Sequence, residues 1–280
     1  MRSFVRRSPF VTFTVLAFLI TWAVWVPRAL VDQGMIDGQV WVAVGGFWSY
    51  GPAIAAVLAA CIVGGRGQLR ELGRRLTRVR VGWRWYAVAV FGPALAAGMV
   101  AGVSVMLGSS WIDVRPVAFG DGIVVAAVFF VVVSLTDGLG EEVGWRGYAL
   151  PRLLERLPAV RASLLLGIVW AAWHLPLFWT DGAPLEGSPI WALFLRLPAT
   201  AIIFTWVFQH TRGSTVIAVL LHGAMNLFAS PVTLQPTIIA AVAVHWLIAV
   251  GLVAAERLER PTSKPGEPTI VGPPATDAEA

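Results

Sequence analysis

The residues best suited to chemistry begin with two adjacent carboxylates, Glu141 and Glu142, and an arginine four positions further on, Arg146. They follow an apolar run, Ile123 to Leu135, that contains no charged residue. A charged side chain at the centre of a bilayer costs about 2.5–3.5 kcal/mol even on lenient insertion scales, so such groups usually mark a site. Residues four apart share a helix face, so Glu142 and Arg146 are expected to pair. Glu141 points about 100° away and is free to face another group.

Two later segments offer ring and amide groups at the same helical spacing. Trp170 and His174 lie four residues apart in one apolar run, and His222 and Asn226 lie four apart in another. Each pair should therefore project from one face of its own helix. We expect these two segments and the acidic pair to converge inside a helical bundle and form one polar site.

Hydrolysis of an amide bond is one reaction that such a set can support. It needs a base that activates water and donors that hold the developing oxyanion. Glu141 is the candidate base, and His174 can hold or polarise the water. His222 and Asn226 can supply the donors.

The same residues raise the question of a metal. Two histidines and a glutamate, His174, His222 and Glu141, make a reasonable zinc ligand set with one open position. The sequence has no His-Glu-x-x-His pair on one helix, however. Zinc or another divalent metal and a metal-free, glutamate-activated water both remain open.

In their order along the chain, the three motifs resemble the CAAX protease and bacteriocin-processing family. This family contains the type II CAAX prenyl endopeptidases and is also called the Abi family of intramembrane proteases. The resemblance covers about residues 120–230, and family members usually have Phe at the position of Trp170. The motifs here read Glu141-Glu142-Val143-Gly144-Trp145-Arg146, Trp170-Ala171-Ala172-Trp173-His174 and His222-Gly223-Ala224-Met225-Asn226.

The resemblance implies an intramembrane endopeptidase, metal-dependent or glutamate-dependent, acting on a membrane-associated peptide or protein. By resemblance, Glu141 and His174 activate the water. His222 and Asn226 form the oxyanion hole. Glu142 and Arg146 support the site.

Other functions fit the same residues. The acidic pair can form a salt bridge at the membrane surface, and His222 with Asn226 can serve as a hydrogen-bonded pair between helices. The whole protein would then be a non-catalytic immunity factor or scaffold that keeps the fold, or a proton relay. His245 is expected to pack between helices, and Arg196, inside an apolar run, has no firm partner.

Composition indicates how these residues are positioned. Of the 280 residues, 57% are hydrophobic and 13% are charged, and the apolar residues form long runs, which is typical of polytopic helical membrane proteins. Backbone polar groups in lipid must be satisfied within their own element, so the runs should be helices. The 21 Lys and Arg residues cluster between the runs, as in membrane topology signals, and do not indicate nucleic-acid binding.

The runs predict an all-α bundle of about eight transmembrane helices in one domain, residues 1–259, followed by a disordered cytoplasmic tail, residues 260–280. An amphipathic segment near the membrane surface is expected over residues 144–162. The arginine-rich residues 64–84 are expected to be a cytoplasmic loop or a short surface helix. The eight expected spans are 10–26, 41–63, 85–107, 122–138, 163–179, 190–208, 214–228 and 236–255.

Arginine counts in the connections predict the orientation. The N-terminus, the 64–84 and 146–161 segments, Arg212 and the tail fall on one face, which the positive-inside rule makes cytoplasmic. Both termini are therefore expected in the cytoplasm. Because the positive charge is nearly all arginine, we expect a bacterial cytoplasmic membrane.

The expected boundaries create one conflict of depth. At ~1.5 Å rise per residue, His174 lies ~18 Å and His222 ~12 Å from the cytoplasmic ends of their spans. Glu141 follows its span and should lie nearer the surface. The site assembles only if the fourth helix is longer or more tilted than the apolar run indicates.

Overall fold

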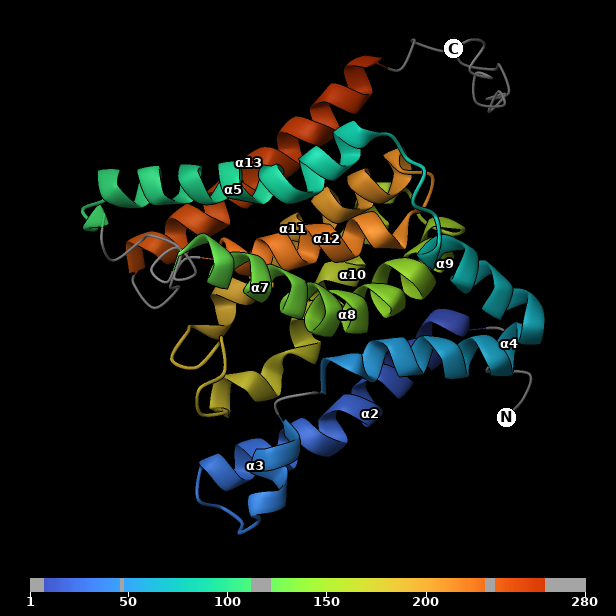
Figure 1. Cartoon of the computed structure of the whole chain (residues 1–280), viewed down its shortest axis with the longest axis horizontal. Helices are drawn as coiled ribbons and strands as arrows, with labels where there is room; N and C mark the ends of the chain where they lie inside the picture. The colour runs from blue at the N-terminus through green and yellow to red at the C-terminus, as the bar shows by residue number, and fades with distance from the viewer. Residues whose placement is uncertain (1–7, 46–47, 112–121, 230–234, 260–280) are drawn as a thin grey trace.

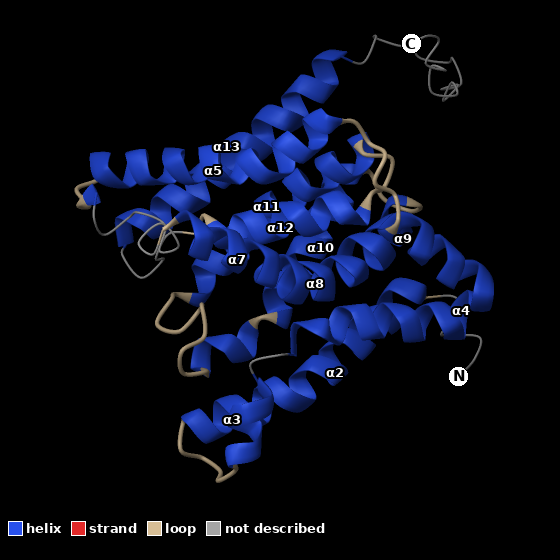
Figure 2. Cartoon of the chain, in the orientation of Figure 1, coloured by secondary structure: helices blue, strands red, loops and turns tan. Residues whose placement is uncertain are grey.

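The computed structural model describes residues 8–45, 48–111, 122–229 and 235–259, and all regular elements in these ranges are helices (Figures 1 and 2). The N-terminal arginines and the expected tail, residues 260–280, lie outside the described residues. The helices are α2 (Pro9–Asp32), α3 (Gln39–Gly45), η1 (Trp48–Tyr50), α4 (Gly51–Leu76), α5 (Trp83–Met106), α7 (Ile123–Val133), η3 (Ser134–Gly138), α8 (Leu139–Gly144), η4 (Trp145–Ala149), α9 (Leu150–Leu154), α10 (Ala159–Trp173), η5 (Leu175–Trp179), α11 (Ile190–His210), α12 (Thr215–Leu227) and α13 (Gln235–Glu259).

Among the described residues, seven helices are long and apolar enough to cross a bilayer, which confirms the all-α polytopic class. Their lipid-facing surfaces stay apolar: Ile123 at the start of α7 is 85% exposed. The eighth expected span, α12, has 13 residues and is about 20 Å long, against a hydrocarbon core of about 30 Å. It is too short to cross alone and is instead enclosed by other helices.

The short helix α12 lies at the centre of the bundle (Figure 1). It packs against α5 on one side and against α7, η3 and α8 on the other, with further contacts to α11. Ser214 caps its first turn by accepting a hydrogen bond from the Ile217 amide. This enclosed position brings His222 next to the acidic pair and Asn226 next to Asp137 of η3.

The second span differs from the expected range of 41–63. Helix α4 begins at Gly51, where Pro52 suits the first helical turn, and α3 is a separate seven-residue helix. α4 continues to Leu76 past a kink at Gly65, whose φ of 60° favours glycine. The arginine-rich stretch is therefore largely helical.

The fourth span also differs, and this correction resolves the conflict of depth. It does not end at residue 138 but continues to Leu154, so the expected amphipathic surface segment over 144–162 is wrong for 144–154. The charges that suggested a surface face are satisfied inside the protein: Arg146 pairs with Glu142, and Arg152 donates to Gln68 and to the Tyr148 carbonyl. Glu141 consequently lies well inside a 32-residue helix.

Contacts between loops divide the connections into two faces. On one face, Arg212 donates to the Arg80 carbonyl at 2.8 Å, and Ser214 donates to the Arg78 carbonyl at 2.7 Å. On the other, the Asp181 amide donates to Asp32 at 3.1 Å. The first face is arginine-rich and the second acidic, in agreement with the expected distribution of the connections.

Candidate active site

The acidic pair lies on α8, a short α-helical stretch between two π-helical segments, η3 and η4. A π-helical turn has an i→i+5 hydrogen bond and shifts the direction in which the following side chains point. Both carboxylates point into the bundle: Glu141 is 4% exposed and Glu142 is fully buried. The long helix thus presents two adjacent acids to different neighbours.

Glu142 forms the predicted ion pair with Arg146. Arg146 Nη1 lies 2.8 Å from Glu142 Oε1, and both side chains are fully buried. The Arg146 guanidinium carbon lies 4.2 Å from the ring centroid of Trp170 and 3.9 Å from that of Phe204. Because an unpaired buried charge is strongly destabilising, the carboxylate and the two aromatic faces together make this arginine tolerable at depth.

His222 links the ion pair to Glu141. Its Nδ1 lies 2.8 Å from Glu142 Oε1, the oxygen that also accepts from Arg146. With Glu142 as a carboxylate acceptor, Nδ1 carries the hydrogen. His222 Nε2 is then directed toward Glu141, 4.0 Å from Oε1.

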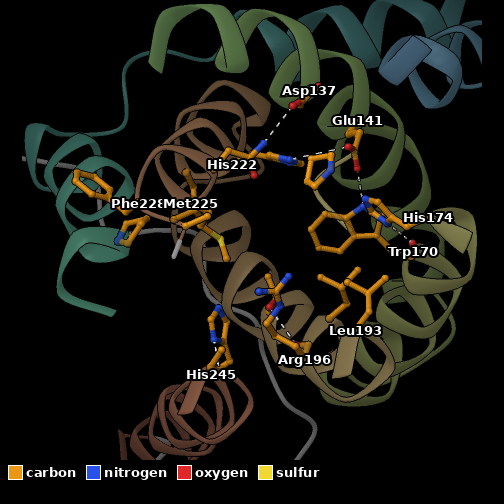
Figure 3. A pocket seen from close by; sticks show the side chains of 18 of the residues that line it. Asp137, Glu141, Trp170, His174, Leu193, Arg196, His222, Met225, Phe228 and His245 are labelled. Carbon is orange, nitrogen blue, oxygen red and sulfur yellow. Dashed lines mark hydrogen bonds and ion pairs between the residues drawn. The ribbon is translucent and has the colours of Figure 1, made fainter. Parts of the chain in front are cut away.

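Glu141 has a strong partner on α10. Trp170 Nε1 donates to Glu141 Oε2 at 2.6 Å. His174 Nδ1 lies 2.8 Å from the Trp170 carbonyl oxygen, which can only accept, so Nδ1 carries the hydrogen and Nε2 is an acceptor. Trp170 therefore fixes both the carboxylate and the neighbouring imidazole (Figure 3).

Asn226 is held by an acid that the sequence analysis missed. Its amide nitrogen donates to Asp137 Oδ2 at 3.2 Å, and Ser49 Oγ donates to Asp137 Oδ1 at 2.8 Å. Asp137 lies four residues before Glu141, so the spacing that paired Glu142 with Arg146 was also the signal for this residue.

A cavity of about 700 Å³ opens beside these groups, within the usual range for ligand sites. Asp137, Glu141, Trp170, His174, His222 and Asn226 all line it. Glu142 and Arg146 do not line the cavity: Glu142 contacts His222 from behind the wall, and Arg146 pairs with Glu142. The structure thus brings all six sequence-predicted residues into one region, with four at the cavity and two supporting them.

The described residues contain no group of three or more His, Cys, Asp or Glu side chains arranged to hold a metal ion. Glu141, His174 and His222, the candidate ligand set, share the cavity wall without meeting that condition. We therefore derive no chemical step through a metal.

Comparison with known proteins bears on the segment that holds this site. Residues 123–228 match the family model described as Type II CAAX prenyl endopeptidase Rce1-like. The CAAX prenyl protease 2 of Methanococcus maripaludis is 32% identical over 136 residues, which are 46% of this chain. The chain spans about half the length of that relative, 49%. The family resemblance indicated by the three motifs is confirmed, and the matched segment includes all six site residues.

Proposed function

We propose that this protein is an intramembrane endopeptidase that hydrolyses a peptide bond of a membrane-associated substrate with a glutamate-activated water. The observation that carries the proposal is a buried carboxylate on a cavity wall, Glu141, with two imidazoles and an amide lining the same cavity. The confirmed resemblance of residues 123–228 supports the same reaction class.

In the proposed first step, a water held by Glu141 and His174 attacks the carbonyl carbon of the scissile bond. Glu141 takes one proton of the water as general base. His174 Nε2, which faces away from the Trp170 carbonyl, accepts the other water hydrogen and orients the nucleophile. The products of this step are a tetrahedral intermediate and a protonated Glu141.

His222 and Asn226 are the proposed donors to the oxyanion. Asn226 gives one amide hydrogen to Asp137 and keeps the second for substrate. His222 gives its Nδ1 hydrogen to Glu142, so its Nε2 donates only when the ring is an imidazolium. Glu142 would stabilise that cation. The proton on Glu141 then passes to the leaving amine as the carbon–nitrogen bond breaks, which restores the starting carboxylate.

A cleavage assay tests the proposal. The purified protein in lipid nanodiscs is incubated with a synthetic peptide ending in a prenylated C-a-a-X sequence, the motif in the name of the curated relative. In parallel, peptides from membranes with and without the protein are compared by mass spectrometry. We expect new peptide ends in at least one of the two experiments.

His174→Asn is the matched inactive control. Asparagine keeps a donor near the position of Nδ1, for the Trp170 carbonyl, and removes Nε2. Cleavage should disappear in this variant while the unfolding temperature stays near that of the wild type. If the wild-type protein generates no new peptide end in either experiment, the endopeptidase proposal fails and the non-catalytic alternative gains support.

A further inference from the structure

Arg196 is a charged residue on the cavity wall that has no role in the proposed reaction. Arg196 lies on α11, six residues after its start at Ile190, which is about 9 Å along the helix. Its side chain is half-buried and lines the same cavity as Glu141 and His222. In Figure 3, Arg196 and His245 lie on the opposite side of the view from Asp137, Glu141 and His222.

The Arg196 guanidinium makes no hydrogen bond, ion pair or ring contact within the part of the chain that the structure describes; only its backbone carbonyl is engaged, by Thr200. The three carboxylates that line the cavity, Asp137, Glu141 and Asp181, form no ion pair with it. Arg146, by contrast, has a carboxylate and two aromatic faces. A guanidinium among membrane-spanning helices is normally paired, so an unmatched one on a cavity wall points to an anion that the described residues do not supply.

The rings of His174 and His245 share the cavity with Arg196. His174 lies with Trp170 and Glu141, whereas His245 lies on the Arg196 side of the cavity (Figure 3). His245 Nδ1 lies 2.7 Å from the Ala241 carbonyl oxygen, and that contact leaves Nε2 as the other polar atom of the ring. The carboxylates of Asp137 and Glu141 lie at one end of the cavity, and the Arg196 guanidinium lies at the other (Figure 3).

We propose that Arg196 is a substrate-recognition residue. It binds the C-terminal carboxylate of the peptide substrate that the water activated by Glu141 cleaves. This inference rests on the proposed function and names a determinant of its specificity. Arginine suits the role because its planar guanidinium donates two parallel hydrogen bonds to a carboxylate.

The position of Arg196 favours a peptide end over a lipid phosphate. Lipid headgroups lie at the bilayer surface, whereas Arg196 lies about a turn and a half inside α11 and faces the cavity that Glu141 and His222 line. The peptide bonds of a bound substrate are uncharged, but its chain end carries a full negative charge. A cavity of about 700 Å³ holds a short peptide end together with the scissile bond.

Binding rather than cleavage provides the sharpest test. The catalytically silent Glu141→Gln protein is placed in phosphatidylcholine nanodiscs. Its affinity is measured for a fluorescent prenylated C-a-a-X peptide with a free C-terminus and for the same peptide with a C-terminal amide. We expect the free acid to bind at least about tenfold more tightly, as for a charge-assisted pair.

Three substitutions are compared in that background. Arg196→Met should bring the acid-to-amide ratio close to one, and Arg196→Lys should retain part of the preference. Arg161→Met, at an exposed position on α10, should leave the ratio unchanged. Because no described group depends on the Arg196 charge, Arg196→Met should not lower the unfolding temperature, and a lowered temperature would indicate a structural role instead.

The outcomes separate the two proposals. Equal affinity for acid and amide, or no binding of either, overturns the inference even if the wild-type protein cleaves peptides. A preference for the acid that depends on Arg196 upholds it even if no cleavage is found. The peptide affinities are also measured in nanodiscs that contain phosphatidylglycerol. If Arg196→Met changes peptide affinity only in those nanodiscs and leaves the acid-to-amide ratio unchanged, Arg196 is a lipid-binding residue and the inference is wrong.

Discussion

At the scale of single residues, the site depends on one shared oxygen atom. Glu142 Oε1 accepts from Arg146 and from His222, each at 2.8 Å, so the carboxylate compensates one buried cation and orients the ring that faces Glu141. Trp170 has a matching role on the other side, with Glu141 at 2.6 Å and its carbonyl holding His174. The groups at the cavity are thus fixed by hydrogen bonds within the protein itself.

This arrangement predicts that Arg146→Met destabilises the protein by about 3–5 kcal/mol, because Glu142 would remain buried without its guanidinium partner. Denaturant unfolding in mild detergent measures the change. Adding Glu142→Gln to Arg146→Met should recover part of the loss, since both charges are then removed. A single variant as stable as the wild type would contradict the supporting role.

Asp137 is predicted to be a positioning residue that acts through Asn226. Asp137→Ala should lower kcat on the order of 10–100-fold, because the amide donor loses its anchor and moves from the oxyanion. The KM should change little, since the amide contributes mainly in the transition state. Steady-state kinetics of the C-a-a-X peptide give both constants. An unchanged kcat, or a change confined to KM, would argue against this role.

The sequence was informative about residues where helical spacing alone decides the contact. The pairing of Glu142 with Arg146 and the shared helix of His222 and Asn226 follow from that spacing. The hydrogen bond from Trp170 to Glu141 joins residues 29 positions apart on different helices, and no local pattern encodes it. Asp137 was missed because its partners, Ser49 and Asn226, lie 88 and 89 positions away.

At the scale of elements, glycines let α8, the helix that carries the acidic pair, approach its neighbours closely. A methyl group at Gly140 would lie 2.6 Å from the Ser49 carbonyl oxygen, and one at Gly144 would lie 2.6 Å from the Pro52 carbonyl oxygen. These positions face η1 and α4, so backbone packs against backbone there, as is common between membrane helices. This contact fixes the direction of the acidic pair.

Gly144→Ala should therefore destabilise the protein by about 1–3 kcal/mol, since the added methyl group meets backbone that cannot rotate away. Gly73→Ala on α4 is the matched control, because nothing lies within 4 Å of its added methyl group. The control should be neutral or slightly more stable. Unfolding midpoints of both variants in the same detergent decide the matter; equal midpoints would show that the close packing is unimportant.

Helix boundaries were the least predictable part of the fold. The apolar runs identify the spans, but the fourth helix continues through charged residues whose partners come from other elements, Gln68 among them. Arginines that are buried and paired resemble arginines on a water-facing surface when only their spacing is known. The short α12 shows the reverse effect: although it is largely apolar, it is shielded by protein and need not match the bilayer thickness.

At the scale of the whole molecule, the orientation decides where substrate enters. The cavity reaches the exposed residues Asp181 and Gly182, on the face opposite Arg78 and Arg212. If both termini are cytoplasmic, as the arginine distribution predicts, this end of the cavity faces the other side of the membrane.

Cysteine labelling of intact cells tests the orientation. Two variants are made in a Cys61→Ser background. The Asp37→Cys variant should react with a membrane-impermeant maleimide on intact cells, whereas the Arg70→Cys variant should react only after the cells are opened. Both positions are exposed, so access differs only by side. The opposite labelling pattern would invert the topology and move the cavity mouth to the cytoplasm.

The central claim is that Glu141 is the base that activates the hydrolytic water, and its most direct test is the cleavage rate of Glu141→Gln. The amide keeps the size of the side chain and can still accept from Trp170, so the fold should persist. We predict a fall in rate of at least about 10²-fold with an unchanged unfolding temperature, and no fall for the exposed control Glu155→Gln. Full activity in a folded Glu141→Gln protein would contradict the account.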